Sequence, residues 1–294
     1  MHVPLPTSAR SGEALRMGSR FRQDGLALAS LALIVAFVLA AILAPVVAPY
    51  PEQGRGRPNL SERLQPPSTA HLLGTDDVGR DLLSRLLFGA RPSLATGFVV
   101  VALAVLIGLP LGAIAGFLGG WVDEAIMRLT DVFMSFPALL LAVAISMALG
   151  PSLLNAMVAI SLTWWPLYAR LVRAQAVSVK QETFIEASRA IGMSEGRIIV
   201  EHVLPHITTP VLIQATADVG AAILMGAALS FIGLGVQPPD PDWGNMLAVA
   251  RVYFREAAWF ALFPGLAILL VAAAFNLVGD AARDSLDPRS RRSR

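Results

Sequence analysis

The sequence predicts an all-α, polytopic membrane protein with six transmembrane helices. Of its 294 residues, 55% are hydrophobic and only 15% are charged, whereas charged residues make up about a quarter of an ordinary soluble domain. The mean hydropathy is +0.63. The apolar residues also run without interruption over stretches of roughly 20 residues, the length that a helix needs to cross the hydrocarbon core. These observations exclude an ordinary soluble domain.

The first two spans are predicted on either side of a long polar loop. The first covers residues 26–48, in a stretch without Asp, Glu, Lys, Arg or His. Because this stretch is longer than the apolar core of a secretory signal, we expect an uncleaved anchor. The second span is centred on residues 97–116, and its glycines allow neighbouring helices to approach closely.

The uncharged stretch at residues 132–169 is too long for one helix. Gly150-Pro151 lies in its middle and is a helix-breaking pair. The sequence therefore predicts the third span before this pair and the fourth span after it. The third span is expected to start near Glu124 and to contain the break-prone pair Phe136-Pro137.

The fifth span is predicted at residues 208–235 and the sixth at residues 257–279. An even number of spans places both termini on one side of the membrane. Lys and Arg favour the segments that face the cytoplasm when the N-terminus is inside, so both termini are expected to be cytoplasmic. The chain then divides into a cytoplasmic N-terminal tail (1–24), the first helix with a long extracytoplasmic loop (25–92), a five-helix core (93–282) that contains a cytoplasmic loop at 176–206, and a basic cytoplasmic tail (283–294).

The composition excludes several classes of function. Cysteine is absent, so the chain has no disulfide, no thiolate metal site and no cysteine nucleophile. The sequence pI is about 9.5, but the arginines lie at helix ends and in the tails, where anionic lipid explains them. We therefore expect contact with membrane lipid and none with nucleic acid. We identify no catalytic residue and no cofactor site.

Two pairs of residues have the spacing of metal ligands but lack the rest of a site. His202 and His206 stand at i and i+4, as in helix-borne zinc sites, but Pro205 lies between them and no third ligand is obvious. Asp240 and Asp242 lack the glycine-bearing ligand loop of a calcium site. No metal site is predicted.

The longest polar segment on the cytoplasmic side connects the fourth and fifth spans. Its apolar residues recur at helical spacing up to Ile191, and Gly192 is placed to end this helix in a left-handed conformation. Ser194 can cap a second short helix, which Pro205 limits. The pattern predicts two short helices joined by a glycine turn. A solvated loop with a capped helix is the alternative.

This segment resembles the cytoplasmic signature of the permeases of ATP-binding-cassette importers, which is E-A-A, three residues, G, nine residues and I-x-L-P. The chain departs from that signature at Ser188 and at His202, and a histidine at the latter position is typical of the peptide and nickel branch. The resemblance implies that the loop forms a coupling helix that sits in a groove of an ATPase subunit. The residues with this implied role are Glu186, Ala187, Ser188, Gly192, His202, Leu204 and Pro205.

Two further segments resemble the C-type subunit of dipeptide and oligopeptide permeases, namely residues 71–94 in the first extracytoplasmic loop and residues 229–247 after the fifth span. The second segment contains a proline-rich stretch that stiffens an external loop, followed by a tryptophan suited to the membrane interface. The subfamily pattern has an acidic residue where this chain has Gly226, so a cargo role is not carried over to that position. A binding protein could contact the external loop through Pro239, Asp240, Asp242 and Trp243, and a merely capped loop is the alternative.

Polar residues within the predicted spans are costly to expose to lipid. Asp131, Asp218 and Asn276 are therefore expected to face a partner subunit, the translocation path or one another. Structural hydrogen bonding and contact with cargo are both compatible with this placement.

The chain lacks the phosphate-binding loop of an ATPase. Its only lysine, Lys180, follows Val179 instead of the glycine of the G-x-x-x-x-G-K-[ST] motif. ATP is then hydrolysed on separate subunits, whose closure would push the loop at 176–206 as a rigid lever. The resemblance implies a homologous second permease subunit, two ABC ATPase subunits and an extracytoplasmic substrate-binding protein, at the inner membrane of a bacterium. Di- and oligopeptides are the expected cargo, with nickel chelates or another small polar solute as alternatives.

Two rival classes of protein fit the sequence less well. A secondary transporter driven by an ion gradient would need a chain of acidic residues within its spans, and this chain has few. An intramembrane enzyme would need clustered histidines and carboxylates at one membrane level. The sequence therefore favours a subunit that transports without catalysing a reaction.

Overall fold

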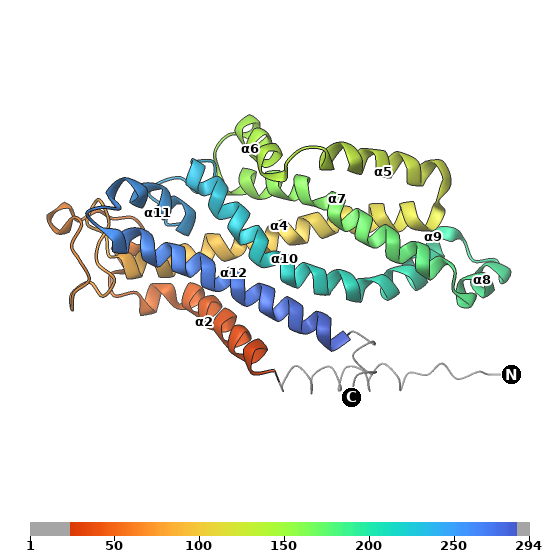
Figure 1. The fold of residues 1–294 in the computed structure, drawn as a ribbon, viewed down its shortest axis with the longest axis horizontal. Coiled ribbons are helices and arrows are strands. Elements are labelled where there is room, and N and C mark those ends of the chain that lie inside the picture. The colour runs from red at the N-terminus through yellow and green to blue at the C-terminus, as the bar shows by residue number, and fades with distance from the viewer. Residues whose placement is uncertain (1–23, 287–294) are drawn as a thin grey trace.

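The computed structural model describes residues 24–286, and every regular element within this range is a helix. Residues 1–23 and 287–294, which include most of the two predicted tails, lie outside the described part. The helices form an elongated bundle (Figure 1). At one end lies α8 (Thr183–Ala190), and at the other lie the first long loop and α11 (Trp243–Ala250).

A helix of spanning length is confirmed at the first predicted span, and the helix at the second is longer than predicted. α2 (Gly25–Val47) begins after Asp24, whose carboxylate accepts two backbone hydrogen bonds from the first turn. α4 (Leu82–Leu118) contains the second span, but its first turns come from a segment predicted as loop. The helix starts there because the Asp81 carboxylate accepts a hydrogen bond from the N–H of Ser84 and caps the first turn.

The break in the third predicted span is also confirmed. α5 (Gly120–Met134) and α6 (Ala138–Leu149) are separated by Ser135-Phe136-Pro137 and are bent by 88°. α6 ends at Gly150, which has a φ of 88° and so confirms the split at Gly150-Pro151. A positive φ favours glycine because glycine has no Cβ.

Within residues 24–286, four helices are long and apolar enough to cross a membrane, or five if the bent α5–α6 pair is one span. α7 (Leu153–Lys180) lies at the position of the fourth predicted span and is long enough, but it is not among them. Its aliphatic run is interrupted by Trp164, Trp165 and Tyr168, all of which are buried. Because neighbouring helices cover these side chains, α7 needs less aliphatic surface toward lipid.

Glycines of α4 allow α7 to pack closely against it. Gly108, Gly112 and Gly116 recur every four residues, and a Cβ on each would lie 2.6, 2.4 or 2.5 Å from a backbone oxygen of α7. Such contacts are typical of helices that meet through small residues in membranes. The close helix approach predicted from these glycines is confirmed.

The fifth predicted span lies in α10 (Leu204–Ile232) and the sixth in α12 (Ala258–Leu286), and these two helices pack against each other. α12 also contacts α2, so the first and last described helices are neighbours. Short helices outside the bundle core include α3 (Pro51–Gly54), η1 (Leu60–Glu62) and η3 (Arg251–Tyr253).

The helix after the glycine turn continues where the sequence predicts that it stops. α9 (Glu195–Ile198) passes through a π-helical turn, η2 (Ile199–Val203), directly into α10. The prediction that Pro205 limits the second helix is wrong. The wider π turn shifts the hydrogen bonding directly before the proline, where the Leu204 N–H donates to the Ile199 carbonyl, so the missing N–H of Pro205 does not end the helix.

Candidate functional site

We define the coupling segment as residues 176–206, and α8 is the longer of the two short helices within it. The inner face of α8 is buried through Ile185 and Ser188. The Ser188 hydroxyl donates to the backbone carbonyl of Phe184 at 2.8 Å, so its polar group is satisfied within the helix. Glu186 and Ala187 lie on the exposed side. α8 therefore has one face against the bundle and one face free.

A Schellman turn ends α8 at Gly192. Gly192 has a φ of 82°, as the sequence predicts. Its N–H donates to the Arg189 carbonyl at 2.9 Å, and the Met193 N–H donates to the Ser188 carbonyl at 3.1 Å. These two hydrogen bonds define the motif. Ser194 stands at the predicted N-cap of α9, but its side chain makes no capping hydrogen bond.

Charged side chains fix this turn to the end of α4. Arg189 donates to the Glu195 carboxylate at 3.0 and 3.2 Å, which ties α8 to α9. The Arg189 guanidinium also lies 5.2 Å from the ring centre of Phe117, and Lys180 Nζ lies 6.0 Å from the same ring. Phe117 is fully buried near the C-terminus of α4. The coupling segment is therefore attached to the bundle through α4, α7 and α10.

The residues of the predicted coupling signature divide by exposure. Those that are exposed are Glu186, Ala187, Gly192 and Pro205. Ser188 is buried, and His202 and Leu204 are partly buried. The signature therefore combines residues that a partner can reach with residues that support α8 from below.

The exposure of Ile191 differs from the prediction, because its helical spacing places it with the apolar residues of α8. This side chain is 78% exposed. It follows the last residue of α8 and precedes the left-handed glycine, so it leaves the buried face where the helix ends. Its position beside Gly192 was the signal that could have identified it.

The histidine pair of this segment is held by local contacts. His206 stacks on Phe184 with ring centres 5.0 Å apart, and His206 Nδ1 lies 2.6 Å from the carbonyl oxygen of His202. Within residues 24–286, no group of three His, Cys, Asp or Glu residues is arranged to hold a metal ion.

The polar residues predicted within the spans have different surroundings. Asp131 pairs with Arg170. Asp218 accepts hydrogen bonds from the Tyr168 hydroxyl at 2.7 Å and from the Gln214 amide at 2.9 Å. Asn276 is exposed on α12. The structure does not bring these three residues together.

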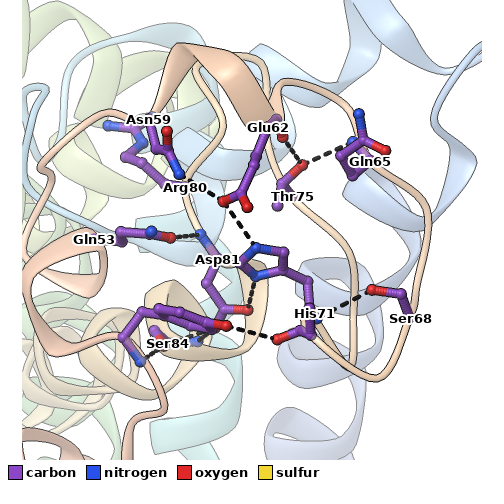
Figure 2. Close-up of polar contacts among 12 residues, drawn as sticks. Gln53, Asn59, Glu62, Gln65, Ser68, His71, Thr75, Arg80, Asp81 and Ser84 are labelled. Atoms are coloured by element: carbon purple, nitrogen blue, oxygen red, sulfur yellow. Dashed lines mark hydrogen bonds and ion pairs between the residues drawn. The ribbon is translucent and has the colours of Figure 1, made fainter.

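A buried histidine organises the outer cap, which we define as residues 48–81 (Figure 2). His71 Nδ1 lies 2.9 Å from Asp81 and His71 Nε2 lies 3.1 Å from Glu62. Burial lowers the pKa of His71, but the hydrogen bonds and charges of Asp81 and Glu62 outweigh this effect and raise it overall. Asp81 also accepts hydrogen bonds from Ser84, so the cap is joined to the first turn of α4.

The structure corrects the interpretation of the external loop after α10. Trp243 is 1% exposed, and its Nε1 donates to the Leu86 carbonyl at 3.0 Å, so it is not an interfacial anchor. Asp242 is also buried; it caps α11 and accepts a hydrogen bond from the Ser93 hydroxyl at 2.9 Å. Both side chains hold α11 against α4 because their polar groups need partners once buried. Of the predicted contact residues, only Pro239 and Asp240 are exposed.

α10 meets α4 closely at the position where the subfamily pattern has an acidic residue. A Cβ on Gly226 would lie 2.4 Å from Cγ2 of Thr96. In this chain, Gly226 therefore serves helix packing.

The long apolar helices define a multi-pass helical membrane protein. Its similarity to known proteins then identifies the family. Residues 108–292 match the family described as binding-protein-dependent transport system inner membrane component. Residues 13–67 match the N-terminal TM domain of oligopeptide transport permease C. The chain belongs to the family of binding-protein-dependent transport system inner membrane components, in its C-type peptide permease branch.

Individual relatives agree with this family. The dipeptide transport system permease protein DppC of Alkalihalophilus pseudofirmus is 46% identical over 270 residues, covering 92% of this chain and 88% of the relative. The probable D,D-dipeptide transport system permease protein DdpC of Escherichia coli K12 is 50% identical over 232 residues, covering 79% and 78%. The glutathione transport system permease protein GsiD of another Escherichia coli strain is 42% identical over 271 residues, covering 92% and 88%.

A solved structure supports the fold. A chain of the MetNI methionine ABC transporter, in an inward-facing conformation, matches with a TM-score of 0.56 and 20% sequence identity. The match covers 70% of this chain and 97% of that chain. The described helices therefore have the fold of an ABC importer permease.

Proposed function

We propose that this chain is the C-type membrane subunit of an ATP-driven importer of di- and oligopeptides in the bacterial inner membrane. The family supports this proposal, as do the dipeptide and glutathione permeases among the relatives. Two separate ABC ATPase subunits would hydrolyse ATP, and a homologous second permease would complete the path. An extracytoplasmic binding protein would deliver the cargo. This chain would form part of the transport path and would supply no catalytic residue.

The construction of the coupling segment is the observation that carries the proposal. α8 presents a free face with Glu186 and Ala187, while its other face and the Arg189–Glu195 bridge fix it to the bundle. The chain then runs through α9 and η2 into α10 without a break. A displacement of α8 by ATPase closure would therefore reach α10 through a continuous helical path, and a shift of α10 is a motion that alternating access can use.

We further propose six spans with both termini in the cytoplasm, with α7 as the fourth span. The arrangement in Figure 1 supports this, because α4 and α7 both run from the end with the outer cap to the end with α8, and α10 returns. The absence of cysteine makes a direct test simple. Single cysteines would replace Leu72, Trp121 and Ile191, which are 61%, 80% and 78% exposed.

In intact spheroplasts, a membrane-impermeant maleimide should label the cysteine at Leu72 only. The cysteines at Trp121 and Ile191 should react only after lysis, because both would lie on the cytoplasmic side. Labelling of the Ile191 position before lysis would contradict the proposed orientation.

The coupling proposal is tested by placing a negative charge at the exposed turn after α8. Ile191→Asp, in the full complex expressed with its neighbouring genes, should lower peptide-stimulated ATPase activity at least tenfold or release the ATPase subunit. Val252→Asp is the matched control, because Val252 is 73% exposed in η3, which directly follows α11 and is outside the coupling segment. If no ATPase subunit copurifies with the wild type, the importer proposal fails.

The cargo is tested in proteoliposomes that contain the complete complex and its binding protein. Radiolabelled dialanine should accumulate in an ATP-dependent manner. Uptake of a nickel chelate instead of the peptide would assign the chain to the other cargo class.

A further inference from the structure

A cavity of about 490 Å³ opens at the outer end of the bundle. It lies between the outer cap, α4, the start of α7 and the loop after α10, and this volume is typical of sites for small organic ligands. Phe88 and Leu153 contribute apolar surface. The charged residues that line it are Arg55, Arg91 and Asp240.

The two cations of this cavity gather around one aromatic ring. The guanidinium groups of Arg55 and Arg91 lie 5.7 and 5.6 Å from the ring centre of Phe88, which is 6% exposed. Both groups can therefore face an anion in the same cavity while the ring supports them through cation–π contact.

Arg91 is positioned by α2 rather than by a carboxylate. It donates from Nε to the Ala41 carbonyl at 2.6 Å and from Nη2 to the Ile42 carbonyl at 3.1 Å. The Ala41 carbonyl is available because Pro45, four residues later in α2, has no N–H. Among the described residues, no carboxylate forms an ion pair with Arg91. Its position is fixed while its charge stays available.

Asp240 supplies a negative charge to the same cavity. It is exposed and has no ion pair among the described residues. Arg85 lies near enough to influence it electrostatically, but its Nη1 donates to the Pro239 carbonyl at 3.2 Å instead. Arg55 has only a 3.5 Å contact with Glu52, and both side chains are more than half exposed. The cavity thus offers both signs of charge without pairing them with each other.

We propose that this cavity is a subsite for the zwitterionic backbone of a short peptide, a step that rests on the proposed function. The carboxylate of the peptide faces Arg55 and Arg91, its ammonium group faces Asp240, and a side chain packs on Leu153. An extended dipeptide spans roughly 7 Å, which the cavity accommodates. The site receives cargo at the outer end of the path, before the helices of the core.

The test uses the purified complex in nanodiscs of phosphatidylcholine, without binding protein and without ATP. Three probes are compared by equilibrium binding: dialanine, N-acetyl-dialanine, which lacks the ammonium group, and dialanine amide, which lacks the carboxylate. The wild type should bind dialanine about fivefold more tightly than either blocked peptide, a preference in the range of partly exposed charge pairs.

Each variant should remove one preference only. Asp240→Asn should lose the preference over N-acetyl-dialanine, and Arg55→Ala should lose the preference over dialanine amide. Arg57→Ala and Glu256→Gln are matched controls, because both residues are exposed, lie outside this cavity and should leave both preferences intact. Arg91 stays unchanged because it also holds α2.

Two results would overturn the proposal. If Asp240→Asn and Arg55→Ala each still bind dialanine more tightly than both blocked peptides, the cavity does not recognise the charged termini of the peptide. A zwitterionic phospholipid headgroup also carries an ammonium group and an anion. If the wild type shows no preference for dialanine and Arg55→Ala instead lowers retention of phosphatidylethanolamine, lipid occupies the cavity. Failure of ATP-dependent dialanine uptake by the wild-type complex would refute the proposed function separately.

Discussion

Replacing Gly192 by alanine should weaken the coupling segment without creating a clash. An added Cβ at Gly192 would have no heavy atom within 4 Å, so the cost comes only from its φ of 82°. A left-handed conformation costs an ordinary L-residue about 1–2 kcal/mol. The Schellman hydrogen bonds from Gly192 and Met193 depend on this conformation. We therefore expect the ordered turn to lose at least about 1 kcal/mol, which is roughly a fivefold change in its equilibrium constant.

Gly196 provides the matched control in the same segment. A Cβ there would also have no heavy atom within 4 Å, but Gly196 lies in α9 and does not have a positive φ. Alanine in a helix is favoured over glycine by roughly 0.5–1 kcal/mol. The two Gly→Ala substitutions should therefore have effects of opposite sign on the same turn.

Amide hydrogen exchange over residues 183–198 of the purified complex measures this effect, and peptide-stimulated ATPase activity measures its consequence. Gly192→Ala should raise exchange about fivefold and lower the stimulation, whereas Gly196→Ala should leave exchange unchanged or slower. If both variants raise exchange equally, the added methyl group itself is responsible and the reasoning from the positive φ is refuted.

Three further substitutions test the helix packing, the outer cap and the loop after α10. Gly112→Ala places a Cβ 2.4 Å from a backbone oxygen of α7 and should lower the melting temperature. Gly265→Ala is the control and should not lower it, because the nearest neighbour of its Cβ would be 3.9 Å away. Equal shifts of the melting temperature would contradict the packing argument. Because the folded pKa of His71 is raised, its stabilising effect is complete below its unfolded pKa of about 6.5 and is lost as the pH rises through the folded value. His71→Asn should therefore abolish the increase in proteolysis of the cap between pH 6 and pH 8.5, and an unchanged increase would exclude this role. Asp242→Ala should lower the free energy of unfolding by about 1–3 kcal/mol in denaturant titrations, because it removes a helix cap and the acceptor of the Ser93 hydroxyl proton, and Asp242→Asn should cost less.

The membrane helices could be predicted because lipid imposes one rule on the sequence. A spanning helix needs a long apolar stretch, so α2 agrees with its predicted span within a residue or two. Gly150 and Phe136-Pro137 mark breaks for local steric reasons and were also predictable. The early start of α4 was not, because Arg85 and Arg91 interrupt the apolar residues of its first turns, which therefore lack the uncharged stretch that marks a span.

The candidate coupling site was predictable as a set of residues but not as a surface. The spacing of Glu186, Gly192 and Leu204 identifies the segment, yet spacing alone does not tell that Ser188 is buried and Ile191 exposed. Those properties depend on how α8 packs against α9, η2, the start of α10 and the end of α4. The error at Trp243 has the same origin, since tryptophan is common at membrane interfaces but here fills a tertiary contact.

α10 connects the proposed coupling segment to the proposed peptide subsite. Its 29 residues extend over about 44 Å at the usual rise per residue. At the outer end, the loop after α10 is held by the buried hydrogen bonds of Asp242 to Ser93 and to the first turn of α11. At the other end, the helix begins with the π turn η2, whose hydrogen bonding is less regular. An axial displacement of α8 is therefore absorbed more easily at η2 than at the outer loop. If both proposals hold, a displacement that exceeds what η2 can absorb would move Asp240 relative to Arg55 and would couple the state of the ATPase to the affinity of the outer subsite.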